Sequence, residues 1–82
     1  MTSDVVHSYT TVIKRWVAPI VHGIIFGIQY ATCGNKHVDR AVDGMTGDTL
    51  LTFDCTGSQY EKFKELVQEL YPEACTFDVG YW

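Results

Sequence analysis

Reactive side chains gather in one stretch of the sequence, residues 33–49, which reads CGNKHVDRAVDGMTGDT. A cysteine, a histidine, an arginine and three aspartates lie in this segment. Such groups can hold a metal ion or serve as general acid and base. The alternative is a polar hairpin between two hydrophobic strands, and the spacing of the residues decides between the two.

The spacing argues against a metal site. Cys33 and His37 form one close pair, but a second zinc pair would have to combine Cys55 with Cys75, twenty residues apart. Structural zinc sites use two close pairs, and free cysteines are usually small buried residues. The aspartates also miss the alternating pattern of a calcium loop. We therefore predict no metal and no cofactor.

Catalysis has candidate bases but no accompanying motif. His7, His22 and His37 are the histidines, and the sequence has neither a nucleophile elbow nor a phosphate-binding glycine loop. Asp54 and Asp78 would form a carboxylate pair only if their strands were neighbours. We expect a protein without enzymatic activity.

Acidic residues recur regularly between residues 58 and 72. Glu61, Glu65 and Glu69 follow each other at four-residue spacing, opposite an apolar stripe. On a helix this spacing aligns like charges, which destabilise it by a few tenths of a kcal/mol per pair. The row is either a solvated face or an acidic ridge that recognises a basic surface.

The charge of the chain is divided between its halves. Residues 1–40 carry four basic and two acidic side chains, a net charge of +2, and residues 41–82 carry two basic and eight acidic ones, a net charge of −6. Six basic residues are too few for a large phosphate-binding face, so we expect no nucleic acid partner. A basic protein suits the acidic half better.

From small size, acidity and abundant aromatic residues we predict a protein-binding module. Small acidic domains of this kind include inhibitors such as antitoxins, immunity proteins and phage counter-defence proteins, which block a basic surface of their partner. The predicted partner-binding residues are Glu61, Glu65, Glu69, Asp43, Asp48, Tyr81 and Trp82.

The alternative is an oligomeric protein that binds a small molecule or nucleotide. A domain this short has little room for an internal pocket, so a homodimer would supply the walls. Its site would use the basic residues of the first half, Lys14, Arg15, Lys36, His37 and Arg40.

The cysteines and the apolar stretch bear on the compartment. Three unpaired cysteines and the lack of a signal-peptide pattern predict reduced thiols and a cytoplasmic protein. The apolar run over residues 16–31 contains Pro19, His22 and Gln29 and is too short for a clean membrane span. We expect it to be buried and expect no membrane partner.

The elements that position these residues are clearest in the second half. Residues 58–72 predict a helix, with Ser58 and Glu61 as a capping box. Alternating apolar residues predict strands at 37–42, 49–55 and 75–82, with a turn at 43–48.

The first half is less clear. Residues 4–17 carry a helical stripe that Pro19 would end, although their β-branched content leaves a strand open; residues 20–33, rich in isoleucine, predict a strand. The order is then α-β-β-β-α-β. We predict a single α+β domain over residues 1–82, with a four-stranded, mostly antiparallel sheet and two helices on one face. The last two strands would be parallel and joined by a helical crossover, and the first three would form an antiparallel meander.

Overall fold

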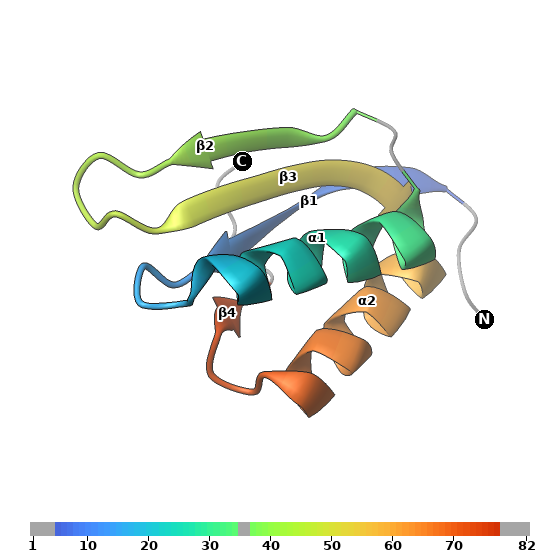
Figure 1. Cartoon of the computed structure of the whole chain (residues 1–82). Coiled ribbons are helices and arrows are strands. Elements are labelled where there is room, and N and C mark those ends of the chain that lie inside the picture. The colour runs from blue at the N-terminus through green and yellow to red at the C-terminus, as the bar shows by residue number, and fades with distance from the viewer. Residues whose placement is uncertain (1–4, 35–36, 78–82) are drawn as a thin grey trace.

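Four strands form one antiparallel sheet, and both helices pack against the same face of it (Figure 1). The computed structural model describes residues 5–34 and 37–77. The elements are β1 (Val6–Ile13), α1 (Pro19–Cys33), β2 (Asp39–Val42), β3 (Thr49–Thr56), α2 (Gly57–Leu70) and β4 (Cys75–Thr76). The predicted α+β class and the number of strands and helices are confirmed.

The strands lie in the order β2-β3-β1-β4. β1 is antiparallel to both β3 and β4, so β3 and β4 are parallel to each other, with β1 between them. The predicted parallel relation of the last two strands is therefore confirmed. Of the predicted meander, the antiparallel pairing of residues 37–42 with 49–55 is confirmed as β2 and β3, and the strand at residues 20–33 is wrong. Two β-α-β units interleave in this order, which is the ferredoxin-like arrangement. This arrangement serves many unrelated functions, so it assigns none here.

The predicted helix at residues 4–17 is wrong, because residues 6–13 form strand β1. Tyr9, Thr11 and Ile13 alternate along β1 and pair with the inward-facing positions of β3. Thr11 is fully buried in this arrangement. Strand alternation places Thr11 on the same side as Tyr9 and Ile13. The fold accepts this polar residue inside because β-branched side chains fit a pleated sheet.

The predicted strand at residues 20–33 is also wrong, because residues 19–33 form helix α1. Pro19, expected to end a helix, instead begins one: its fixed φ angle and missing N–H suit the first helical turn. Gly34, with a φ angle of 79°, ends the helix through a bond from its N–H to the carbonyl of Tyr30. α1 carries apolar residues on every side, so its sequence shows no single apolar stripe at helical spacing.

The predicted helix in the second half is confirmed, with different ends. α2 begins at Gly57, and its capping box joins Thr56 to Gln59 rather than Ser58 to Glu61. The predicted strand at residues 75–82 is β4 at Cys75–Thr76, and residues 78–82 lie outside the described part of the chain.

The core lies between the helices and the inner face of the sheet. Phe53 of β3 packs edge-on against Phe63 of α2, with ring centroids 5.2 Å apart. Tyr9 of β1 stacks on Tyr60 of α2 at 4.1 Å. Ile25 brings α1 into the same cluster. Because this cluster occupies one face of each helix, the opposite faces form the outer surface of the helical layer.

Candidate functional site

The outer side of α1 is an exposed surface without a charged residue. Ile20 is 74% exposed and Ile24 is 39% exposed. Gly23, Gly27 and Ala31 are exposed between and beyond them. These five residues, called the apolar α1 face below, lie on one side of the helix because they recur at three- and four-residue spacing. A helix that is apolar all round is normally buried on all sides, so this face is unusual for a surface.

The two glycines of the apolar α1 face have no role in packing within the chain. A Cβ atom built at Gly23 or Gly27 would meet no atom within 4 Å, and neither residue has a positive φ angle. Glycine inside a helix costs about 0.5–1 kcal/mol relative to alanine. Because these glycines have no side chains, another molecule can approach the α1 backbone closely at these two positions.

Apolar surface continues at the end of the helical layer. Trp16, in the loop between β1 and α1, is 69% exposed. It lines a shallow pocket of about 330 Å³ with Val21, Leu70 and Tyr71, where the start of α1 meets the end of α2. The helix predicted over residues 4–17 gave no indication of this exposed position. An exposed tryptophan is a frequent anchor of protein interfaces.

The predicted acidic ridge is present on α2. Glu61, Glu65 and Glu69 are all exposed and occupy one face of the helix, away from the core residues. Glu61 forms an ion pair with Lys64 at 3.4 Å. α1 and α2 pack side by side, so the acidic ridge and the apolar α1 face belong to the same helical layer (Figure 1).

The two hairpin aspartates predicted to bind a partner form hydrogen bonds within the chain. Asp43 Oδ1 accepts from the backbone N–H groups of Met45 at 2.8 Å and of Thr46 at 3.3 Å. Asp48 Oδ1 accepts from the backbone N–H of Arg15 at 2.9 Å, which holds the hairpin against the loop after β1. The hairpin lies at the other end of the sheet from the start of α2 (Figure 1).

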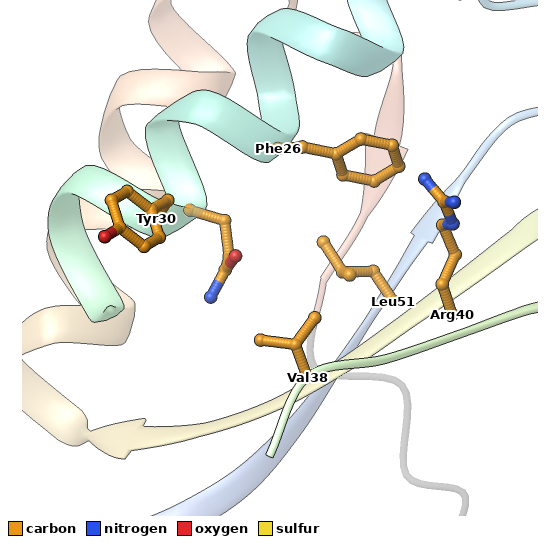
Figure 2. A pocket seen from close by; sticks show the side chains of 6 residues that line it. Phe26, Tyr30, Val38, Arg40 and Leu51 are labelled. Atoms are coloured by element: carbon orange, nitrogen blue, oxygen red, sulfur yellow. The ribbon is translucent and has the colours of Figure 1, made fainter. Parts of the chain in front are cut away.

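The basic residues of the alternative site are not brought together. Lys14 and Arg15 follow β1 at the hairpin end, whereas His37 lies just before β2. Lys36 is outside the described residues, as are Tyr81 and Trp82 of the predicted partner site. Arg40 alone lines a pocket, between α1 and β2 (Figure 2).

That pocket has a volume of about 420 Å³ and six lining residues. Figure 2 shows Phe26 of α1 pointing toward Arg40 and Leu51 on the side of the sheet, with Val38 below them and the Tyr30 ring at the side of the pocket. The guanidinium carbon of Arg40 lies 4.9 Å from the centre of the Phe26 ring, in a cation–π contact. The sixth lining residue is Gln29, which is buried.

A polar cluster lies on the outer face of the sheet, around Asp54. Ser8 Oγ donates to Asp54 Oδ1 at 2.6 Å, and His37 Nδ1 lies 2.7 Å from Asp54 Oδ2. Because both Ser8 and His37 bond to the carboxylate, the histidine does not activate the serine as in a catalytic triad. The cluster ties β1, β3 and the start of β2 together. The sequence did not predict this cluster, because a helix was expected at residues 4–17. Asp78, the other member of the possible carboxylate pair with Asp54, is outside the described residues.

The cysteines have the character of core thiols. Cys33 and Cys55 are buried and Cys75 is half-buried, and all three are free. Burial, with a hydrogen bond from the Cys55 thiol to Cys33, raises the pKa of Cys55 to about 12, and burial raises the pKa of Cys75 to about 11. Thiols with raised pKa values are poor nucleophiles and poor metal ligands at neutral pH. Across residues 5–34 and 37–77, no cluster of three His, Cys, Asp or Glu side chains is placed to bind a metal ion.

Neither helix of the described chain has the length and apolar character needed to cross a membrane. No family model, curated protein or solved structure shows a significant match to this chain, so its function has to be read from the chemistry of its own surfaces.

Proposed function

We propose that this protein is a protein-binding module and that the outer surface of its helical layer is the contact site. The observation that carries the proposal is the apolar α1 face, an uncharged helix surface exposed to solvent in the layer that also carries the acidic ridge of α2. Exposed apolar patches bordered by polar residues mark interaction sites on soluble proteins.

The partner has a defined chemistry under this proposal. An apolar patch on the partner covers Ile20 and Ile24, and its backbone or small side chains approach α1 closely at Gly23 and Gly27. A row of Lys and Arg beside that patch meets the acidic ridge. Apolar contact then supplies most of the affinity, and the opposite charges increase the association rate and fix the orientation.

The mode of action we propose is inhibition by occlusion. The chain is small and carries a net charge of −4, so it can cover a basic surface of its partner and exclude acidic ligands from it. Nothing in this mode requires catalysis by the inhibitor.

Two variants of the contact surface test the proposal, with one matched control. Ile20→Lys places a charge in the apolar α1 face, and the triple variant Glu61→Lys/Glu65→Lys/Glu69→Lys reverses the acidic ridge. Val6→Lys is the control, because Val6 is 45% exposed on the opposite face of the sheet. All the substituted positions are exposed, so thermal unfolding of each protein should stay close to that of the wild type.

Partners are captured from a host lysate with wild-type protein, purified, and measured against each variant by surface plasmon resonance. We expect Ile20→Lys to weaken binding on the order of 30-fold, mainly through faster dissociation. The triple variant should slow association and reverse its dependence on salt. A captured protein that binds all three variants equally would disprove the proposed site. So would sedimentation showing that a second copy of the chain occupies the apolar α1 face.

A further inference from the structure

The space between α1 and the edge strand β2 has the features of a small-molecule site. All four residues of β2 are exposed, and among the described strands β2 pairs with β3 alone. The pocket of about 420 Å³ opens here, on the side of α1 that faces β2 (Figure 2). Binding pockets for small molecules start at about 300 Å³.

Arg40 supplies the charge of the pocket. Its position opposite Leu51 in the β2–β3 register directs it to the helix-covered side of the sheet, where it stacks on Phe26. None of the carboxylates in the described segments lies within ion-pair distance of its guanidinium. Stacking orients the planar group while leaving its N–H donors available for a bidentate contact with an anion.

Gln29 supplies a hydrogen-bond acceptor. Its side chain is 3% exposed, and its Nε2 donates to the carbonyl of Gly34 at 2.8 Å. A carbonyl only accepts, so this bond fixes which end of the amide is the nitrogen. Oε1 receives no hydrogen bond from any residue of the described part of the chain. Oε1 is not a fully buried atom, so it meets solvent, and the N–H or O–H group of a ligand would take the place of that water.

The remaining walls are apolar or aromatic. Phe26, Val38 and Leu51 line the pocket between Arg40 and Gln29, and the ring of Tyr30 stands at its side (Figure 2). A second hollow, of about 360 Å³, shares Phe26 and Arg40 and extends toward His22 near the start of α1. A flat ligand body therefore has apolar surface to cover on both sides of the arginine.

We propose that this pocket binds a small aromatic carboxylate that also carries a hydrogen-bond donor. The carboxylate pairs with Arg40, the donor reaches Gln29 Oε1, and the ring packs against Phe26, Val38 and Leu51. The six residues that line the pocket include none of the apolar α1 face and none of the acidic ridge, so the proposal does not depend on the proposed protein partner.

Three probes separate the features of this ligand in ¹H–¹⁵N correlation spectra of the full chain. Indole-3-acetate has the ring, the donor and the carboxylate; indole-3-acetamide lacks the charge; acetate lacks both the ring and its N–H donor. We expect indole-3-acetate to shift the resonances of Phe26, Gln29 and Arg40 saturably. Each of the other two probes should bind on the order of tenfold more weakly.

The variant Arg40→Gln should weaken indole-3-acetate by a similar factor and leave indole-3-acetamide unchanged. Lys62→Gln is its control, because it removes the same charge from an exposed position on α2. Dispersed spectra of both variants report that the fold is intact. Equal binding of indole-3-acetate to wild type and Arg40→Gln, or shifts confined to residues outside the pocket, would overturn the proposal.

Discussion

Thr56 and Gln59 bond to each other's backbone at the start of α2. Thr56 Oγ1 accepts from the backbone N–H of Gln59 at 3.2 Å, and Gln59 Oε1 accepts from the backbone N–H of Thr56 at 2.9 Å. Two backbone donors that the helix cannot satisfy internally are thereby paired. This junction fixes where β3 ends and α2 begins, and therefore sets the position of the acidic ridge.

Removing the cap should destabilise the whole protein. Thr56→Ala is expected to lower the free energy of unfolding by about 1 kcal/mol, the usual cost of losing a helix N-cap. Ser58→Ala, inside the first turn, should change it by no more than a few tenths of a kcal/mol. Urea denaturation followed by circular dichroism measures both. A larger effect of Ser58→Ala than of Thr56→Ala would show that Thr56 is not the N-cap of α2.

Replacing the buried hydroxyl of Thr11 should stabilise the protein, in contrast to removal of the helix cap. Thr11 is fully buried, and within the described chain its Oγ1 is the one buried side-chain oxygen or nitrogen without a hydrogen-bond partner. Thr11→Val keeps the shape and removes the desolvation cost, so we expect about 1 kcal/mol of added stability.

Thr10→Val is the matched control for Thr11→Val. Thr10 Oγ1 lies 3.2 Å from Thr52 Oγ1, so its replacement leaves a partner unpaired and should not stabilise the protein. Chemical denaturation of the two variants under identical conditions tests this. If both changes had the same sign and size, the environment assigned to Thr11 would be wrong.

Alkaline pH should destabilise the protein through Cys55. Its pKa is about 12 in the folded state, against 9.0 for an ordinary cysteine. As the pH rises above 9, the unfolded chain releases this proton while the folded protein keeps it. The stability that Cys55 contributes is therefore complete below pH 9 and is lost between pH 9 and pH 12.

The comparison with Cys55→Ala isolates this contribution. Between pH 8 and pH 10, wild type should lose about 1 kcal/mol more unfolding free energy than the variant, because only wild type carries the Cys55 thiol. The variant will start from a lower stability, since it leaves a cavity. Parallel pH profiles for the two proteins would contradict a buried, protonated thiol at this position.

The glycines of α1 separate stability from binding. Gly23→Ala and Gly27→Ala each add a Cβ that meets no atom of the chain within 4 Å, so each should stabilise the protein by about 0.5–1 kcal/mol. The same methyl groups should weaken a partner that packs closely on α1. Thermal unfolding and the affinity for the captured partner measure the two effects. If the variants were stabilised and their affinity for the partner were unchanged, the partner would not contact α1 at these glycines.

The sequence by itself determined the elements whose signals are local. The apolar stripe from Tyr60 to Val67 defines α2, the alternation through Leu51 and Phe53 defines β3, and the aspartates around Gly47 make the turn. Each depends on interactions within a few residues, and the acidic ridge follows directly because its positions are fixed once the helix is known. The α+β class follows from these same elements.

Only the tertiary structure decided the first half of the chain. Residues 4–33 contain two segments that are both rich in β-branched and apolar residues, so local preference does not distinguish helix from strand. Packing does: the central position between β3 and β4 requires an extended strand, and β1 places Tyr9 and Ile13 inward there. α1, apolar all round, covers the sheet with one side and leaves the other exposed. The apolar α1 face and the Arg40 pocket both arise from that choice, because each joins residues that meet only after the chain has folded.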